Sequence, residues 1–322
     1  MWYLIGDVGG TNLRLAAVDA KGDFLARQSR ASAGEAAVTE ACTALIAEMG
    51  RPPGAVAIAA AGVVVDDRVT FTNAGLNITK AALARACDVA VEKIILLNDF
   101  AAAAWSLATL DQVTYLQGAP APEQEPRVII GPGTGLGVGA LLWHQGQPLA
   151  VPGEGGHMRL TPHRAQEVPY FEALIAAWPE VQMGEGLAVE AEAILSGSGV
   201  PKWYQAIAKV RGEAAPLQSA EAIFDAANAK TDDIAREAIA LFAQYLGGLA
   251  GDLGLVFGAR GGVFITGGVA QANPWLFDAE FIAAFVAGGR HSNWRRALPL
   301  GLCQDPDFGL KGARNCLFAQ VD

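Results

Sequence analysis

One carboxylate near the start of the chain stands inside a stretch of small residues. The stretch follows the apolar run Trp2–Ile5 and consists of Gly6, Asp7, Val8, Gly9, Gly10, Thr11 and Asn12. An alternating apolar segment begins at Leu13, so the pattern predicts strand, tight turn and strand. Because the turn lacks bulky side chains, its backbone N–H groups can approach an anion, and the carboxylate of Asp7 could hold a cation. An ordinary glycine hairpin would show the same pattern.

A second glycine turn repeats this arrangement in the middle of the chain. An apolar strand over Val128–Ile130 precedes it, a strand over Val138–Trp143 follows it, and between them stand Gly131, Pro132, Gly133, Thr134, Gly135, Leu136 and Gly137. Two domains that each present such a hairpin suggest a cleft between them. No lysine follows a glycine, which excludes a Walker A loop. Neither turn fits G-x-G-x-x-G or leads into a helix, which disfavours a nicotinamide dinucleotide fold.

Two polar residues, Asn98 and Asp99, end the buried strand predicted over Ile94–Leu97 and begin an alanine-rich helix. Ligands collect at the carboxyl ends of strands in open α/β sheets, so Asp99 is a candidate general base. Its alternative role is to cap the helix that follows.

A glutamate and a histidine three residues apart, Glu154 and His157, form the next candidate. On a helix this spacing would suggest a metal site. Here Gly155 and Gly156 separate the pair and Pro152-Gly153 precedes it, so we predict a loop. Such a loop suits recognition of a polar ligand, although a turn stabilised by its own hydrogen bonds would have the same sequence.

Two further candidates carry a weaker signal. Gly267 and Gly268 follow the apolar strand predicted over Val263–Ile265, where they could let a flat ring lie against the backbone. Glu190 and Glu192 fall on a helix predicted over 189–196, and each taken alone is typical of a solvated helix face.

The remaining pattern predicts α/β units. One compact unit closes near residue 108, and the second opens in the same way as the first. Helices are expected over residues 35–49, 79–87, 100–107, 165–178, 189–196, 202–211, 219–228 and 234–253, and from about 309 to the C-terminus.

Composition limits the classes of partner. A length of 322 residues suggests about two domains. The net charge of −10 argues against nucleic acid and anionic membranes as partners. The four cysteines are dispersed, which fits a reducing compartment. We see no signal peptide, and charged residues and glycines interrupt the longest apolar region, so a soluble cytoplasmic protein is expected.

In combination these segments resemble the bacterial glucokinase family of the actin–hexokinase–Hsp70 ATPase superfamily. Residues 6–12 and 131–137 are similar to its first and second phosphate motifs. Asn98-Asp99-Phe100 resembles its sugar-binding strand end, 152–157 its glucose loop, and 262–268 its adenosine motif. The resemblance covers nearly the whole chain, with the motifs in the family's order.

The resemblance implies an α/β, two-domain actin-like ATPase (ribonuclease H-like) fold with an interdomain cleft where ATP and sugar meet. A small α/β domain would comprise residues 1–108 plus 304–322, and a large α/β domain residues 109–303. It further implies a homodimer.

The resemblance also implies roles for single residues. Sugar hydroxyls would be held by Asn73, Asn98, Asp99, Glu154, His157 and Glu192. Glu192 is matched through the run Glu-Ala-Ile-Leu-Ser-Gly, and Glu190 is its competitor. Asp99 would be the catalytic base. ATP would contact Gly6, Asp7, Val8, Gly9, Gly10, Thr11, Asn12, Gly133, Thr134, Gly135, Gly267 and Gly268, and Asp7 would hold Mg²⁺ through water.

The implied activity is transfer of the γ-phosphate of ATP to the 6-hydroxyl of glucose. One departure bears on specificity: the family commonly has a tryptophan three residues after Asn73, where this chain has Leu76. A kinase for another hexose or an N-acetylhexosamine is therefore the main alternative. A nucleotide-switch ATPase without sugar chemistry is a more distant one. The zinc motif of the related repressor/kinase family is absent from the sequence, so neither a zinc site nor a repressor role is expected.

Overall fold

The computed structural model describes residues 1–9, 12–31, 34–71, 77–151 and 153–321. By its contacts the chain forms two compact units. The first holds Met1–Asp111, Leu141–Pro152 and Asp305–Asp322, and the second holds Gln112–Ala140 and Gly153–Gln304. The sequence places the segment Leu141–Pro152 in the expected large domain, whereas the contacts group it with the first unit. The expected domain boundaries themselves stay a prediction.

The first unit is built on a five-stranded sheet in the order β3-β2-β1-β4-β8. The central strand β1 pairs antiparallel with β2 and parallel with β4, and β4 pairs parallel with β8. The strands β1, β4 and β8 are mainly apolar and buried, whereas the edge strand β3 is mostly polar and exposed. The bounds are β1 (Trp2–Val8), β2 (Asn12–Asp19), β3 (Phe24–Ala31), β4 (Val56–Ala60) and β8 (Ile94–Asn98).

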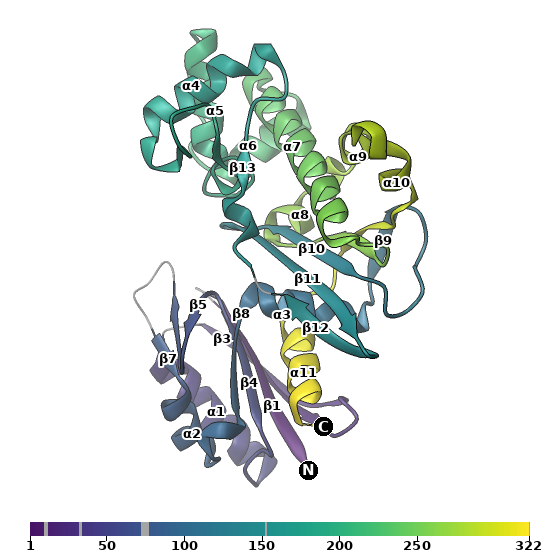
Figure 1. Ribbon diagram of the computed structural model, residues 1–322. Helices are drawn as coiled ribbons and strands as arrows, with labels where there is room; N and C mark the ends of the chain where they lie inside the picture. Colours follow the sequence, from purple (N-terminus) through teal and green to yellow (C-terminus); the bar gives the residue numbers. More distant parts are fainter. Residues whose placement is uncertain (10–11, 32–33, 72–76, 152, 322) are drawn as a thin grey trace. The chain divides into compact units, whose positions relative to one another are not determined.

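Helices and a small second sheet complete this unit. The C-terminal helix packs against β1, β4 and the helix that follows β8, as Figure 1 shows. Thr79 caps α2 by accepting from the N–H of Ala82. The helices are α1 (Glu35–Met49), α2 (Lys80–Cys87), η1 (Val91–Lys93), α3 (Asp99–Ser106), η2 (Leu107–Thr109) and α11 (Phe308–Val321). The small sheet has β5 (Gly62–Val65), β6 (Arg68–Phe71) and β7 (Asn77–Thr79).

A second sheet has six strands in the order β12-β11-β10-β15-β16-β9. Its strands β9, β10, β15 and β16 and the start of β11 belong to the second unit. β15 pairs parallel with β10 on one side and with β16 on the other. The bounds are β9 (Val113–Gln117), β10 (Arg127–Pro132), β11 (Leu136–His144), β12 (Gln147–Val151), β15 (Gly262–Ile265) and β16 (Leu300–Cys303). A separate antiparallel pair joins β13 (Arg159–Leu160) to β14 (Val189–Glu190).

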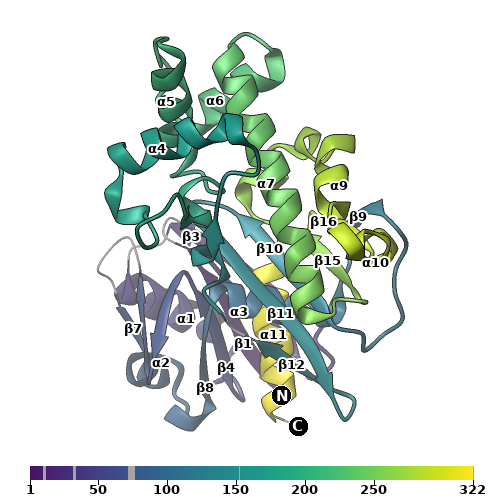
Figure 2. The ribbon, with the colours of Figure 1, turned by 45° about the horizontal axis from the view of Figure 1, so that its top comes forward.

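The longest helix, α7 (Asp233–Phe257), is the core helix of the second unit. It packs along α9 and against β10 and β15 (Figure 1, Figure 2). By length and composition it could cross a membrane, but 67% of its most apolar window is buried, as in the core helix of a soluble protein.

The other helices are α4 (Val168–Ala177), α5 (Val200–Arg211), α6 (Ala220–Ala229), α8 (Gly268–Ala272), α9 (Ala279–Val286) and α10 (Ser292–Ala297). The 3₁₀ turns are η3 (Gly155–His157), η4 (Ala165–Glu167), η5 (Pro179–Val181), η6 (Ala191–Ala193), η7 (Pro274–Leu276) and η8 (Gly289–His291).

The helix predicted over 189–196 is wrong. That segment is the strand β14 followed by the 3₁₀ turn η6. Val189 pairs with Leu160, and the N–H of Ala191 donates to the carbonyl of Met158 at 2.8 Å. This long-range pairing outweighs the helix propensity of the alternating alanine and glutamate residues.

Candidate functional site

The first glycine turn joins β1 to β2. The N–H of Gly9 donates to the carbonyl of Asn12 at 2.8 Å, which closes the turn. Gly6 is required by packing, since a Cβ there would lie 2.5 Å from Cδ1 of Ile58. Gly10 and Thr11, both predicted phosphate contacts, lie outside the described residues.

Asp7 lies beside this turn with one close neighbour from the far end of the chain. Gly309 of α11 faces it so closely that a Cβ on Gly309 would lie 2.6 Å from the carboxylate carbon of Asp7. On β2, Arg14 stands opposite Asp7 in the strand pairing. Burial raises the pKa of Asp7, while the charge of Arg14 lowers it and that of Asp307 raises it. A half-buried carboxylate with a raised pKa is in an environment that favours a cation.

The fit to a metal rests on this single carboxylate. Among the residues that the structure describes, no group of three or more His, Cys, Asp or Glu side chains could hold a metal ion. Mg²⁺ commonly keeps several waters and is held by one or two carboxylates together with substrate phosphates. The surroundings of Asp7 fit that mode of binding rather than an all-protein cage.

At the end of β8, Asn98 rather than Asp99 caps the helix. The Oδ1 atom of Asn98 accepts from the N–H groups of Phe100 at 2.8 Å and Ala101 at 3.3 Å. Its Nδ2 donates to the carbonyl of Gly62 at 3.0 Å, which fixes the amide in place. Asp99 lies half-buried in the first turn of α3, where its Oδ1 accepts from the N–H of Phe100 at 3.0 Å. Asn98 is therefore the N-cap residue of α3, and Asp99 adds a second acceptor for the N–H of Phe100.

The second glycine turn receives a carboxylate from a distant part of the chain. Oε2 of Glu192 accepts from the N–H of Leu136 at 2.7 Å. A Cβ on Gly135 would lie 2.5 Å from the same oxygen, so only glycine leaves room for it. The carboxylate of Glu192 therefore lies directly on the turn.

The segment after Glu192 fixes the turn from the same side. The N–H of Gly197 donates to the carbonyl of Gly133 at 2.8 Å, and that of Ser198 to the carbonyl of Thr134 at 3.2 Å. Within the turn, the N–H of Gly133 donates to the carbonyl of Gly135 at 2.8 Å. The Leu-Ser-Gly run and the glycine turn thus form one unit of backbone structure.

The loop that carries His157 packs on β11. A Cβ on Gly156 would lie 1.9 Å from the carbonyl oxygen of Leu136, and one on Gly155 would lie 2.7 Å from the side chain of Val138. The two glycines are therefore needed for close packing, and the loop ends in the short turn η3. Nδ1 of His157 lies 3.0 Å from Oε2 of Glu190. This loop and Glu192 thus contact the same strand.

The segment predicted to meet adenosine also lies beside the second turn. Gly267 has a φ of 91°, which favours glycine, and a Cβ there would lie 2.5 Å from the carbonyl oxygen of Pro132. The N–H of Thr266 donates to the carbonyl of Ile130 at 2.9 Å. Gly268 begins α8, and a Cβ there would meet no atom within 4 Å. The space beside Gly268 is open to a ligand.

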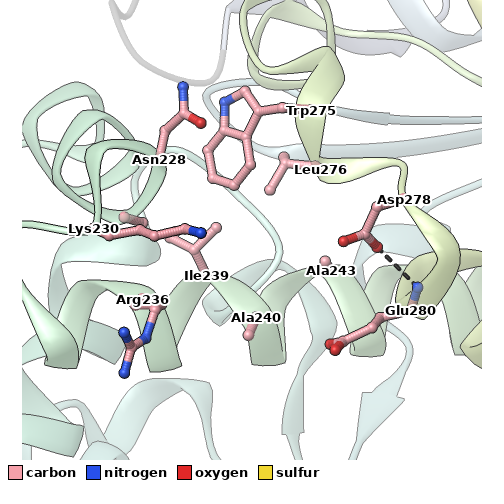
Figure 3. Close-up of a pocket in the computed structure, with 11 residues that line it drawn as sticks. Asn228, Lys230, Arg236, Ile239, Ala240, Ala243, Trp275, Leu276, Asp278 and Glu280 are labelled. Atoms are coloured by element: carbon pink, nitrogen blue, oxygen red, sulfur yellow. Dashed lines mark hydrogen bonds between the residues drawn. The ribbon is translucent and has the colours of Figure 1, made fainter.

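A cavity of about 220 Å³ lies elsewhere in the second unit (Figure 3). The end of α6, the side of α7, and η7 with the start of α9 form its walls. Figure 3 shows Lys230 and Arg236 toward one end and Asp278 and Glu280 toward the other, with Trp275 between them. None of the residues predicted from the sequence to bind sugar or phosphate lines it.

The structure thus groups the predicted residues within each unit. Glu154, His157 and Glu192 contribute to one polar cluster, because all are close enough for the two glutamates to influence the pKa of His157. Asn98 and Asp99 are adjacent in the first unit, and Asn73 lies outside the described residues. Sequence reasoning missed two contacts. One is that of Gly309 with Asp7, for which no local pattern exists, and the other is that of Glu190 with His157.

The fold is shared with solved sugar kinases. A crystal structure of glucokinase from an Antarctic psychrotroph superposes with a TM-score of 0.84 at 27% identity and covers 98% of both chains. A hexokinase of the ROK type from Thermus thermophilus superposes with a TM-score of 0.69 at 22% identity, over 97% of this chain and 96% of its own. The protein therefore has the actin-like ATPase fold of sugar kinases.

Sequence comparison defines the family. The family model described as Glucokinase matches residues 4–320. A glucokinase from Mesorhizobium japonicum is 37% identical over 315 residues, which are 96% of this chain and 89% of the relative. The chain belongs to the glucokinase family and is an ATP-dependent hexose kinase.

Proposed function

We propose that this chain transfers the γ-phosphate of ATP to the 6-hydroxyl of glucose and releases glucose 6-phosphate and ADP. The observation that carries the proposal is the position of Glu192. Its carboxylate, a group suited to sugar hydroxyls, lies on the glycine turn, a backbone suited to phosphate. Sugar and phosphate recognition are therefore adjacent within the second unit, and glucokinases are the relatives that the sequence matches.

Asp99 is the proposed catalytic base. It accepts the proton of the 6-hydroxyl while the hydroxyl oxygen bonds to the γ-phosphorus and the bond to the β-bridging oxygen of ATP breaks. Asn98 precedes it as the N-cap of α3, so Asp99 lies in the first turn of that helix, at the carboxyl end of β8. Asn98, Glu154, His157, Glu192 and Asn73 hold the other hydroxyls and so orient the sugar for attack.

The two glycine turns are the proposed phosphate-binding segments. The N–H groups of Gly9 and Gly133 close their own turns, and Gly6 and Val8 shape the first turn. Backbone N–H groups of Gly10, Thr11 and Asn12 and of Thr134 and Gly135 stabilise the phosphate charge as it shifts. Gly267 and Gly268 contact the adenosine. Asp7 would hold Mg²⁺ through water, and the bound ion would supply neutralisation of the phosphate charge.

Replacement of Asp99 tests the catalytic role. We expect Asp99→Asn to lower kcat by about 10²–10⁴-fold, the usual contribution of a general base, with little change in glucose affinity. Asparagine keeps the acceptor for the N–H of Phe100, so the fold should survive. Asp88→Asn is the control, because Asp88 is an exposed acid at the end of α2 in the same unit. Near-normal kcat in Asp99→Asn would remove Asp99 as the base.

A substrate panel tests the choice of sugar. Phosphorylation of glucose, mannose, fructose and N-acetylhexosamines is measured by coupled ADP detection. We expect glucose to have the highest kcat/KM. A higher value for another sugar would favour the alternative that Leu76 raises, in a segment that lies outside the described residues.

We further propose that the enzyme acts in the cytoplasm as a homodimer. The net charge of −10 and the four reduced, buried cysteines are compatible with that compartment. Light scattering of the purified protein measures the assembly directly. A mass of 33.4 kDa at micromolar concentration would contradict the dimer.

A further inference from the structure

We propose that Glu190 is a positioning residue for His157, and that its carboxylate holds Nδ1 of the imidazole so that Nε2 is the atom offered to the sugar. The inference rests on the proposed sugar role of His157. It assigns different work to two glutamates that stand only two positions apart.

The contact is fixed by the backbone on both sides. Glu190 belongs to β14 and pairs with Arg159 of β13, two residues after His157. The N–H of Ala191 donates to the carbonyl of Met158 at 2.8 Å, which locks the same two segments together. The strand pairing brings the two backbones together, and the side chains then place Nδ1 of His157 3.0 Å from Oε2 of Glu190. Glu190 is also half-buried, which strengthens its hydrogen bond.

The neighbouring glutamate has a different partner. Oε2 of Glu192 accepts from the N–H of Leu136 on the second glycine turn. Glu190 faces the histidine, and Glu192 faces the turn. Glu190 ends the strand β14, and Glu192 lies in the 3₁₀ turn η6 that follows.

The charges around His157 agree with this assignment. The hydrogen bond with Glu190 is the largest cause of a raised pKa of His157; partial burial opposes it, and the charges of Glu192 and Glu154 add to it. Arg159 is the residue that pairs with Glu190 on the neighbouring strand, and the loop glycines approach Leu136 and the apolar Val138 of β11.

A held Nδ1 gives Nε2 a defined role at any pH. In the protonated ring Nε2 donates, and in the neutral ring with Nδ1–H it accepts. A sugar hydroxyl can both accept and donate, so the contact survives titration. Without Glu190 either nitrogen can carry the proton of the neutral ring, and the pKa of His157 falls toward the ordinary value of about 6.5.

Nuclear magnetic resonance of the sugar-free protein tests the pairing. The ring nitrogens of the four histidines are followed against pH, and His157→Gln identifies the signal of His157. We expect Glu190→Gln to lower the titration midpoint of His157 and to mix its neutral tautomers. Glu213→Gln is the matched control, because Glu213 pairs with Arg211 in the same unit. An unchanged midpoint and tautomer in Glu190→Gln would overturn the proposal.

Steady-state kinetics test the consequence for the sugar. We expect Glu190→Gln to raise KM for glucose by about tenfold, the effect of one misdirected hydrogen bond, with kcat and KM for ATP changed by less than about twofold. Glu190→Asp keeps a carboxylate and should restore part of the affinity. In a His157→Gln background, Glu190→Gln should add nothing.

The outcomes separate this inference from the proposed function. An equal rise in KM in the His157→Gln background would mean that Glu190 contacts the sugar itself, and would overturn the positioning role. A normal KM in His157→Gln, with the expected resonance changes in Glu190→Gln, would overturn the sugar role of His157 and leave the pairing intact.

Discussion

The two glycine turns occupy the same place in two similar sheets, yet each obtains its carboxylate differently. The strand order β3-β2-β1-β4-β8 of the first unit matches β12-β11-β10-β15-β16 of the second. In both, the strand before the turn also pairs parallel with the next strand of the sheet. The first turn carries Asp7 and receives Gly309 from α11, whereas the second carries Gly135 and receives Glu192 from η6.

Both turns therefore pair a glycine with a carboxylate. In the first turn the carboxylate belongs to the turn and the glycine comes from a distant segment, and in the second turn the reverse holds. A half-buried carboxylate needs close but not bulky surroundings, and glycine is the residue that provides them. Asp7 is suited to a cation, because burial raises its pKa and leaves the charged form in need of compensation. Glu192 is compensated by a backbone N–H and is suited to sugar hydroxyls. Under the proposed assignment, the same architecture would serve two kinds of ligand.

Asp7→Ala should have the largest effect on the first turn. We expect kcat/KM for Mg·ATP to fall by about 10–100-fold, as for other groups that act on a metal through its waters. Glucose binding should be retained. The measurement is initial rate against Mg²⁺ concentration, and an unchanged Mg²⁺ dependence would show that Asp7 does not hold the ion.

Gly309→Ala should weaken the same site without removing the carboxylate. The new Cβ would displace Asp7, so we expect a rise of about tenfold in the Mg²⁺ concentration needed for half-maximal rate, within the range known for small misplacements. Alanine also stabilises a helix by about 1 kcal/mol relative to glycine.

Gly248→Ala in α7 controls for that gain, because its Cβ would meet only His163, at 3.5 Å. If Gly309→Ala and Gly248→Ala show the same Mg²⁺ dependence, the contact of Gly309 with Asp7 does not affect metal binding.

Gly135→Ala is the matching change in the second turn. Its Cβ would push Oε2 of Glu192 away from the N–H of Leu136, and we expect KM for glucose to rise about fivefold for the loss of about 1 kcal/mol. Gly133→Ala is the control, since its nearest contact would be 4.0 Å away. If both variants raise KM for glucose equally, the contact with Glu192 is not the cause.

Asp7→Asn should raise the stability of the protein although it lowers the activity. Because the pKa of Asp7 is raised by burial, the folded state holds the proton more tightly than the unfolded chain. The free energy of unfolding therefore falls as the pH rises from about 3.9 through the raised value. Asp7→Asn should remove this loss, so its Tm without ligands at pH 8 should exceed that of the unchanged protein.

Asp19→Asn should act in the opposite direction by a smaller amount. Backbone N–H groups of Asp23 and Lys21 lower the pKa of Asp19, so its charged form favours folding above the ordinary aspartate value. Thermal denaturation at pH 5 and pH 8 compares the two variants. A Tm for Asp7→Asn at pH 8 below that of the unchanged protein would contradict the predicted gain in stability.

Much of the fold follows from local sequence. The strand before the first glycine turn and the helix Glu35–Met49 were both predicted, the helix with the bounds that the structure has, because their apolar periods and end signals agree. The short strands β9, β12 and β16 were not predicted. Each is stabilised mainly by pairing with a neighbour in the sheet, and such pairing leaves little local pattern.

The candidate site divides in the same way. The glycine turns, Asp7, and the order of the motifs are properties of the sequence, because close backbone approach to an anion demands small residues in an unbroken run. Whether Asp99 or Asn98 caps α3 was decided only by the structure, since both side chains can accept the same N–H groups. Tertiary structure likewise assigned Glu190 to His157, Glu192 to Leu136 and Gly309 to Asp7. Those contacts join distant segments whose meeting depends on strand pairing and helix packing, which no local run of residues encodes.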